Sequence, residues 1–476
     1  MNIAKGASTN TLIMKFGGTS VGSVEVMLQV ASIVQDARKK WKYVAVVTSA
    51  MAGVTNSLLK LVNTAIDGNR EQVKNAIQEL RERHLAVLDA ISLPDTRKQQ
   101  TIQEIETILL ELQETCKAIS ILSEASPRSC DVVASTGERL AVRVLSAVLE
   151  STQIKTCFID SSRIIVTDDT FQNALPDFVA TKARADEIIQ PLFAENYTPV
   201  ITGFIGGTPD GVITTLGRGG SDYSAAILSS VLNANEVWIW TDVDGVMSAD
   251  PRLVKDAVTI PELTFREVAE LAYYGAKVLH PKTIRPIIES NIGLRVCNTF
   301  NPQHPGTRLL ETRDIRKGTI KAVTAIPNLD LMSIEGRGML GVPGVAARTF
   351  SAVAETGTSV PMITQSSSEQ TITFAVPQES SATVMAALEK TFAREIRHRD
   401  IDGILKIDSV AIVTTVGAGM AQTAGISGMV FSALGNAKVN VMAIAQGSSE
   451  VSISFVVAEK DLKSALVAIH ALILDD

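Results

Sequence analysis

The apolar residues near the N-terminus alternate between short runs and helical spacing. Residues 11–16 form a short apolar run that two glycines break, and apolar residues then recur at helical spacing between 27 and 37. Residues 43–47 form a second apolar run, which is typical of a buried strand. This alternation predicts an α/β unit with a mostly parallel sheet.

From about 56 to 126 the pattern becomes helical. We interpret the apolar face of this segment as a packing face, formed by Ile102, Ile105, Leu109 and Leu112. The alternation of strands and helices returns at 131 and continues to about 310, with further strands predicted at 199–202 and 237–240. The first part of the chain is therefore expected to be one α/β unit with a helical insert.

The C-terminal part, from about 318, carries an internal repeat. Residues between Gly336 and Phe374 recur 81 positions later, between Gly417 and Phe455, without a gap. Each copy reads as strand, glycine loop, helix, strand, turn and strand, and the residues that follow are again helical. This pattern predicts a βαββαβ module of about 80 residues that is used twice.

A glycine motif in the first copy has the spacing of a dinucleotide-binding fingerprint. Gly336-Arg-Gly-Met-Leu-Gly341 fits G-x-G-x-x-G and follows a predicted strand. However, the next strand ends in Gln365-Ser366 and not in the expected acidic residue, and the second copy has Gln422 in place of the third glycine. We therefore interpret the motif as the loop of a small regulatory module.

Composition excludes several classes of protein. A net charge of −7 and the lack of a Lys/Arg run argue against nucleic-acid binding. No apolar run approaches the roughly 20 residues of a membrane span, and residues 1–10 lack a leader pattern. Scattered cysteines and histidines predict reduced thiols and no metal site. We expect a cytoplasmic protein of two or three domains.

Two glycine loops stand where a strand gives way to a helix. In Lys15-Phe-Gly-Gly-Thr-Ser20 the glycines allow close approach to a phosphate, and Lys15 adds a positive charge. A strand-to-helix turn with an incidental lysine is the alternative. Gly217-Arg-Gly-Gly-Ser-Asp-Tyr223 presents Arg218 for a bidentate carboxylate contact, and Asp222 for Mg²⁺ or for orienting the lysine. The alternative here is a turn with a structural salt bridge.

Other polar residues are ambiguous when taken alone. The stretch Trp240-Thr-Asp-Val-Asp-Gly245 and the following Asp250-Pro-Arg252 stand after a predicted strand, where open α/β sheets bind ligands, although both also suit turns. Glu138 is expected to open a helix and so either serves a site or favours the helix dipole. Together, two glycine loops, basic and acidic groups and no covalent nucleophile favour phosphoryl transfer.

The ordered set of motifs resembles the aspartate kinases over nearly the whole chain. The repeat is similar to a pair of ACT domains. The motifs that carry the resemblance are Lys15-Phe-Gly-Gly-Thr-Ser20, Val47-Thr-Ser-Ala-Met51, Val54-Thr-Asn56, Ser135-Thr-Gly-Glu138, Gly203-Phe204, Thr215-Leu-Gly-Arg-Gly-Gly-Ser-Asp222, Trp240-Thr-Asp-Val-Asp-Gly245, Asp250-Pro-Arg252 and Ala276-Lys-Val-Leu-His-Pro281.

The resemblance implies an amino-acid-kinase-type α/β fold, a parallel-rich sheet sandwiched by helices, followed by two ferredoxin-like βαββαβ ACT domains. The implied domains are 1–312, with the helical insert at about 56–126, then 318–396 and 405–476. The implied reaction moves the γ-phosphoryl of ATP, with Mg²⁺ and no tightly bound organic cofactor, to the β-carboxylate of L-aspartate.

Roles for individual residues follow from the same resemblance. Lys15 and Asp222 are the expected catalytic pair. The aspartate pocket is implied at Ser49, Thr55, Glu138, Phe204, Arg218 and Ser221, with Arg218 on the α-carboxylate and Glu138 on the α-ammonium. The expected ATP contacts are Lys15, Phe16, Gly17, Gly18, Thr241, Asp242, Met247, Arg252 and Lys277. Members of the family usually have Tyr where this chain has Met247, so a hydrogen bond to nucleotide is lost there.

The regulatory half resembles a subtype. The Gln-x-Ser-Ser-Glu stretches at Gln365 and Gln446 are similar to those of threonine-sensitive aspartate kinases, which implies two inhibitor contacts, with threonine favoured over lysine. A homodimer or larger assembly through the ACT domains is expected, as is the absence of the fused homoserine dehydrogenase that some of these kinases carry. Two alternatives stay open: a kinase of another small carboxylate, and a catalytically silent amino-acid sensor.

Overall fold

The computed structural model describes residues 10–275, 279, 281–311, 319–366, 368–420, 423–446 and 451–474. These residues fall into two compact units. The first unit comprises Met1–Val246, Pro261–Phe265 and Val278–Glu311, and the second comprises Met247–Ile260, Arg266–Lys277 and Thr312–Asp476. Two short segments of the central sequence therefore pack with the repeat. The domain boundaries inferred from sequence stay predictions.

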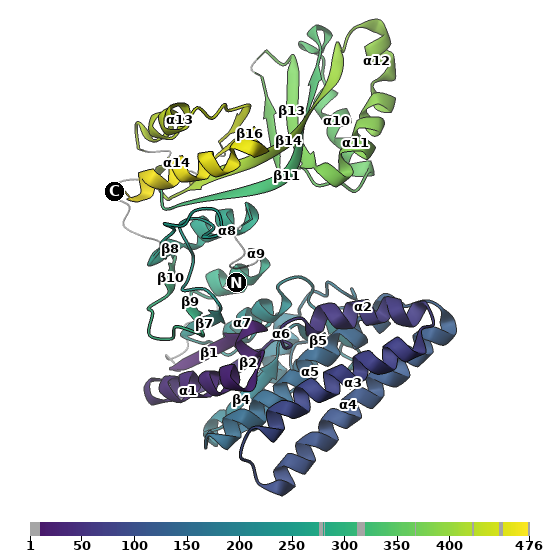
Figure 1. Cartoon of the computed structure of the whole chain (residues 1–476), viewed down its shortest axis with the longest axis vertical. Helices are drawn as coiled ribbons and strands as arrows, with labels where there is room; N and C mark the ends of the chain where they lie inside the picture. The colour runs from purple at the N-terminus through teal and green to yellow at the C-terminus, as the bar shows by residue number, and fades with distance from the viewer. Residues whose placement is uncertain are drawn as a thin grey trace. The chain divides into compact units, whose positions relative to one another are not determined.

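An eight-stranded sheet forms the centre of the first unit, in the order β3-β4-β2-β1-β7-β9-β10-β8 (Figure 1). Neighbouring strands run parallel except β9 and β10. The four segments predicted as strands all lie in it, which confirms the parallel-rich sheet. Its strands are β1 (Thr11–Phe16), β2 (Tyr43–Thr48), β3 (Thr156–Ile159), β4 (Thr198–Thr202), β7 (Glu236–Thr241), β8 (Glu262–Thr264), β9 (Gly293–Asn298) and β10 (Thr307–Leu310).

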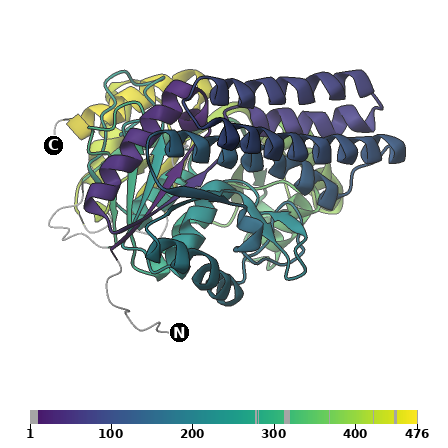
Figure 2. The ribbon, with the colours of Figure 1, turned by 90° about the horizontal axis from the view of Figure 1, so that it is seen from below.

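Helices cover the sheet in two groups (Figure 2). Helices α1 (Val24–Lys40) and α5 (Pro127–Ser151) contact each other and strand β2. Helix α7 (Gly220–Val231) contacts β1 and β7 as well as its neighbours α6 (Phe178–Ala194) and α9 (Pro281–Glu289). A small hairpin of β5 (Ile205–Gly207) and β6 (Ile213–Thr215) leads into α7.

The helical insert consists of α2 (Val54–Ile66), α3 (Arg70–Asp89) and α4 (Asp95–Leu122), which run beside α5 (Figures 1 and 2). Its predicted packing face is confirmed. Ile105, Leu109 and Leu112 are buried in the same core as Leu12 of β1 and Val30 of α1. The insert therefore extends the hydrophobic core around α5.

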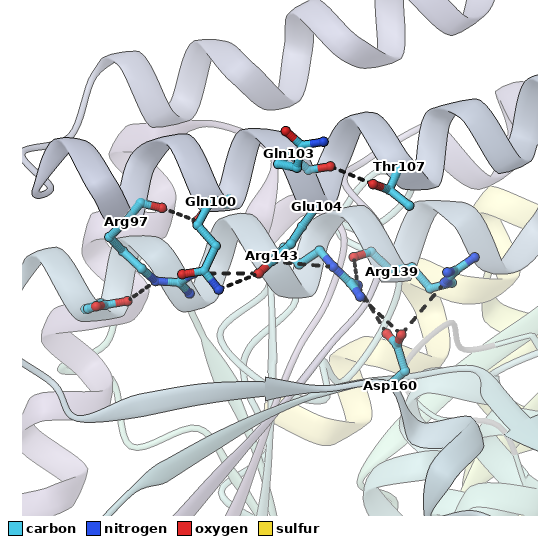
Figure 3. Close-up of polar contacts among 10 residues, drawn as sticks. Arg97, Gln100, Gln103, Glu104, Thr107, Arg139, Arg143 and Asp160 are labelled. Carbon is cyan, nitrogen blue, oxygen red and sulfur yellow. Dashed lines mark hydrogen bonds and ion pairs between the residues drawn. The ribbon is translucent and has the colours of Figure 1, made fainter.

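Ion pairs fix α5 along its length (Figure 3). Arg97 of α4 binds Glu150 near the end of α5, with 2.9 Å between Nε and Oε2. Arg143 of α5 donates to both carboxylate oxygens of Asp160, which follows β3, at 3.2 and 3.3 Å. Arg139 lies 3.8 Å from the same carboxylate. These pairs tie α5 both to the insert and to the edge of the sheet.

The second unit is built on a six-stranded antiparallel sheet, in the order β12-β13-β11-β14-β16-β15 (Figure 1). Its strands are β11 (Ala322–Glu335), β12 (Met362–Gln365), β13 (Thr371–Pro377), β14 (Gly403–Val416), β15 (Ala443–Ala445) and β16 (Ser452–Ala458). Its helices are α8 (Phe265–Tyr273, from Arg266), α10 (Val345–Glu355), α11 (Gln378–Thr391), α12 (Ala393–His398), α13 (Ile426–Asn436) and α14 (Leu462–Leu474).

The two copies of the repeat share their longest strands. The first residues of β11, 322–326, pair with the end of β14, and the first residues of β14, 403–407, pair with the end of β11. Ile401, just before β14, is accordingly buried in the core of the first copy with Phe374, while Val323 of β11 is buried in the core of the second. Each copy is thus completed by residues that the sequence assigns to the other.

Helix α8 packs on the second copy. Glu267 is fully buried and binds Lys321, with 2.7 Å between Oε1 and Nζ. The same carboxylate accepts a hydrogen bond of 2.8 Å from the backbone N–H of Ala418, in the glycine loop of that copy. In the first copy the equivalent N–H, that of Arg337, donates to Asp402 instead, at 3.4 Å. The two glycine loops are therefore held by different partners.

Candidate active site

The parallel strands of the first unit bring several loops to one edge of the sheet. Strands β1, β2, β4 and β7 are parallel neighbours, so the residues after Phe16, Thr48, Thr202 and Thr241 lie at a common carboxyl edge. Open α/β sheets bind their ligands at this edge. The predicted site motifs follow these strands, with the exception of Glu138 and the loop before α7.

A cavity of about 420 Å³ opens among these loops. It brings together Lys15, Gly18 and Asp222 with all six residues predicted for the aspartate pocket. Its lining consists of Lys15, Gly18, Ser49, Ala50, Met51, Ala52, Gly53, Thr55, Asn56, Glu138, Phe204, Gly217, Arg218, Gly219, Gly220, Ser221 and Asp222. Sequence reasoning left out Asn56, although it stands in a quoted motif.

Lys15 and Asp222 form a close ion pair within the cavity. Lys15 is the last residue but one of β1, and Asp222 lies in the first turn of α7. The Lys15 Nζ is 2.5 Å from Oδ1 of Asp222, and both side chains are largely buried. The carboxylate therefore holds the ammonium at a defined place, which is one of the two roles considered for Asp222 from sequence.

Glu138 lies in the middle of α5, not at its start. The helix begins at Pro127, whose preceding Ser126 accepts a hydrogen bond from Ser129 N–H, so the expectation that Glu138 opens a helix is wrong. Gly137, directly before Glu138, lies inside the helix and does not interrupt it. It is needed inside the helix, where a Cβ would lie 2.8 Å from that of Ala50. A contribution to the helix dipole is excluded for Glu138.

The Glu138 carboxylate is buried with an unused acceptor. Glu138 is only 3% exposed, and its Oε1 accepts one hydrogen bond of 3.2 Å from the Ala50 N–H. Among the residues that the structure describes, its other oxygen has no hydrogen-bond partner. Burial raises the pKa of Glu138 to about 8, against the opposing effects of the Ala50 bond and the Lys15 charge. A cationic ligand group would satisfy this oxygen.

Two close approaches shape the remaining wall. Phe204 adopts a left-handed backbone, φ 67°, and its N–H donates to Ser224 Oγ at 2.9 Å. A Cβ on Gly203 would lie 2.6 Å from that of Ser221, so the loop after β4 packs directly on the start of α7. Arg218 stands exposed between Gly217 and Gly219, both with positive φ. It makes no ion pair with any residue described, so the structural salt bridge considered for this loop is formed by Asp222 with Lys15 instead.

The predicted nucleotide residues divide between the two units. Phe16, Gly17, Gly18, Thr241 and Asp242 lie beside Lys15 at the ends of β1 and β7. The Phe16 ring is buried and stacked on Trp240, so only its backbone is available to a ligand.

Met247 and Arg252 belong to the second unit, and Lys277 lies outside the described residues. The guanidinium and the backbone N–H of Arg252 both donate to the Asp250 carboxylate, which fits the turn considered for this segment from sequence.

The predicted effector residues occupy equivalent places in the repeat. Gln365 ends β12, and Gln446 directly follows β15, so both stand at strand ends as expected. Both are exposed. A second cavity, of about 610 Å³, lies in the first copy between the glycine loop and α12, and Gln365 is not among its lining residues.

Two classes of feature are absent from the part of the chain that the structure describes. None of its helices combines the length and apolar character that crossing a bilayer requires. Its His, Cys, Asp and Glu side chains do not gather anywhere in a group of three or more that would hold a metal ion.

Comparison with known proteins identifies the family of the chain. The model of the "Amino acid kinase family" matches residues 10–298, and that of the "ACT domain" matches 332–392 and 413–472. The chain belongs to the amino acid kinase family and carries ACT domains.

Individual relatives narrow this assignment. Aspartokinase 1, chloroplastic, of Arabidopsis thaliana is 32% identical over 474 residues, with 97% of this chain and 79% of that protein covered. The chain therefore belongs to the aspartokinase family. The crystal structure of E. coli aspartokinase III in complex with aspartate and ADP has a TM-score of 0.78 and 29% identity, covering 98% of this chain and all of that one.

Longer relatives also match. The chloroplastic bifunctional aspartokinase/homoserine dehydrogenase 1 of Arabidopsis thaliana is 37% identical over 470 residues, which cover 96% of this chain. The chain spans about half the length of this relative and of others like it.

Proposed function

We propose that the protein is an aspartate kinase, which transfers the γ-phosphoryl of Mg-ATP to the β-carboxylate of L-aspartate and yields 4-phospho-L-aspartate. This is the first step towards lysine, threonine, methionine and isoleucine. The observation that carries the proposal is a cavity lined by the Lys15–Asp222 pair, by Arg218 and by Glu138, whose second carboxylate oxygen has no hydrogen-bond partner among the described residues.

The substrate roles follow from charge. Arg218 offers a planar fork of donors to the α-carboxylate, and Glu138 accepts the α-ammonium. Bringing the ammonium to Glu138 supplies the cation that its buried carboxylate lacks, so binding and ionisation of Glu138 are coupled. Ser49, Thr55, Phe204 and Ser221 complete the pocket. The β-carboxylate is then left facing Lys15.

Phosphoryl transfer needs alignment and neutralisation of charge more than a protein nucleophile. Lys15, held by Asp222, is placed to stabilise negative charge on the moving phosphoryl group. The backbone of residues 16–18, Thr241 and Asp242 serves the nucleotide on this unit. Mg²⁺ binds mainly through nucleotide phosphates in such sites, and Asp222, beside Lys15, is the carboxylate we propose as a further ligand.

The regulatory proposal concerns the repeat. An end-product amino acid, with threonine favoured and lysine second, binds at Gln365 and Gln446 and controls the kinase allosterically. Support comes from the equivalent, exposed positions of the two glutamines at strand ends. We also propose a homodimer or larger assembly through the ACT domains.

The test is a kinase assay with two readouts. ADP formation is measured, and the acyl phosphate is trapped by hydroxylamine as a hydroxamate. Aspartate should give both signals, and the assay is repeated with glutamate and with N-acetylated amino acids. Lys15→Ala should lower kcat by about 10²- to 10³-fold, because a donor aimed at transition-state charge is lost. A hydroxamate from glutamate alone would refute the aspartate assignment, and unchanged turnover in Lys15→Ala would refute the role of the lysine.

A further inference from the structure

Asp131 is a buried carboxylate that no motif singled out. It lies in the second turn of α5, is 1% exposed, and makes no ion pair with the described residues. Its oxygens accept three hydrogen bonds instead. Oδ2 accepts from the N–H of Gln172 at 2.9 Å and of Thr215 at 3.0 Å, and Oδ1 accepts from Thr215 Oγ1 at 2.7 Å. Three directed donors keep a buried carboxylate in one geometry.

The partners of Asp131 form the root of the Arg218 loop. Thr215 ends β6, three residues before Arg218. Its carbonyl accepts from Ala174 N–H at 2.9 Å, which fixes segment 172–174 beside it. A Cβ on Gly217 would lie 3.0 Å from the Gln172 carbonyl oxygen, so this segment also touches the loop itself. Asp131 thus joins the strand that leads to Arg218 to the segment that lies against the Arg218 loop.

The same helix carries Glu138. Asp131 and Glu138 are seven residues apart, which is two helical turns, so both lie on one face of α5 about 10 Å apart along its axis. Helix α5 is itself fixed by the Arg97–Glu150 and Arg143–Asp160 pairs (Figure 3). A single rigid element therefore holds Glu138 directly and the Arg218 loop through Asp131.

We infer that Asp131 is a positioning residue that sets the separation of Arg218 from Glu138, and so the place of the substrate's α-carbon. The inference rests on the proposed function, in which these two side chains bind the α-carboxylate and the α-ammonium. With the α-carbon fixed, the length of the side chain decides whether the far carboxylate reaches Lys15. Asp131 therefore also contributes to the preference for aspartate over glutamate.

The test compares Asp131→Asn with a matched pair at Thr215, using the full chain. In Asp131→Asn the amide oxygen can still accept from the two backbone N–H groups, but the charge is lost and the amide nitrogen replaces the oxygen to which the Thr215 hydroxyl donates. The aspartate KM should therefore rise by roughly 3- to 10-fold while the ATP KM stays within about twofold. Thr215→Val keeps the shape but removes one donor and should raise the aspartate KM by roughly 3- to 10-fold. Thr215→Ser keeps the hydroxyl and should restore values close to wild type.

Amide hydrogen exchange supplies a readout that needs no activity. In the substrate-free protein, residues 216–220 should exchange faster in Asp131→Asn and Thr215→Val than in wild type or Thr215→Ser. An unchanged aspartate KM, or equal rises of the aspartate and ATP KM values, would overturn the inference. If wild type did not phosphorylate aspartate, the proposed function would fail, and unchanged exchange at 216–220 would separately refute the positioning role. If Asp131→Asn does not fold, the Thr215 pair decides.

Discussion

Two buried glutamates, one in each unit, differ in what satisfies them. Glu267 of the second unit is fully buried and is bound by Lys321 and by the Ala418 N–H. Glu138 of the first unit is nearly as buried, yet one oxygen has no partner among the described residues and its pKa is raised. Burial alone does not separate structural charges from functional ones. The difference lies in whether the protein itself completes the hydrogen bonds, and we propose that at Glu138 a ligand does so.

The largest expected effect concerns the satisfied glutamate. Glu267→Ala removes the fully buried carboxylate that binds the Lys321 ammonium and the Ala418 N–H, and should lower the free energy of unfolding by about 3–5 kcal/mol. Urea denaturation measures it, with exposed Glu355→Ala as the matched control. Glu267→Gln, which keeps an acceptor, should lose less. Equal stability of Glu267→Ala and the control would remove the contrast between the two glutamates.

The opposite outcome is expected for Glu138→Gln. Stability should stay close to wild type, since no bound cation is stranded, while the aspartate KM should rise by about 30-fold or more because a buried charge pair with the substrate is broken. The ATP KM serves as the internal control. A destabilised Glu138→Gln with a normal aspartate KM would assign Glu138 a structural role like that of Glu267.

The comparison also predicts a pH dependence. In the proposed site aspartate binds to ionised Glu138, whose pKa in the free protein is about 8. The aspartate KM should therefore fall roughly fivefold between pH 7 and 8 and roughly twofold more by pH 9, where it levels off. This pKa lies above the ordinary value of 4.5, so between pH 4.5 and 8 the folded protein without substrate binds a proton that the unfolded chain does not. The free energy of unfolding should therefore decrease as the pH rises from 4.5 to 8. Initial rates in Glu138→Gln should lack the pH dependence of KM; a profile like that of wild type would contradict the assignment.

The smallest effects are expected at the repeat. Gln365→Ala and Gln446→Ala each remove one side-chain amide from an exposed strand end, and each should raise the threonine concentration for half-inhibition by roughly 3- to 10-fold. Dose–response curves with threonine and lysine measure this, at unchanged uninhibited kcat. If neither substitution altered the response to any amino acid, the effector would bind elsewhere, and the cavity beside α12 would be the next candidate to test.

The sequence predicted the parts of the site that follow directly from strand order. Lys15 and Ser49 come together because parallel strands end at one edge, and Arg218 and Asp222 join them through the glycines before α7. Glu138 was ambiguous when taken alone and was given a substrate role only through the resemblance, since its burial becomes evident only when Ala50 packs on Gly137. The sequence did not indicate a role for Asp131, because it accepts from the backbone N–H groups of Gln172 and Thr215 and from the Thr215 hydroxyl, which are distant in sequence.

The repeat shows a similar limit of local reasoning. The helices and strands of each copy were predicted from periodicity and from the 81-residue offset. The sequence did not predict that β11 and β14 each belong to both copies. The alternation of side chains along an antiparallel strand is the same whichever strand it pairs with. The packing of segments 247–260 and 266–277 with the repeat likewise depends on tertiary contacts such as that of Glu267.

The pairing of β11 with β14 has a consequence for how the repeat folds and unfolds. Each strand is 14 residues long, about 45 Å from end to end, and its first residues, 322–326 in β11 and 403–407 in β14, pair with the end of the other strand, in the neighbouring module. Neither module has a complete sheet when synthesised or excised alone. The pair should melt in a single step, and a gene fragment that encodes one copy should yield an insoluble product, however closely the two halves resemble each other.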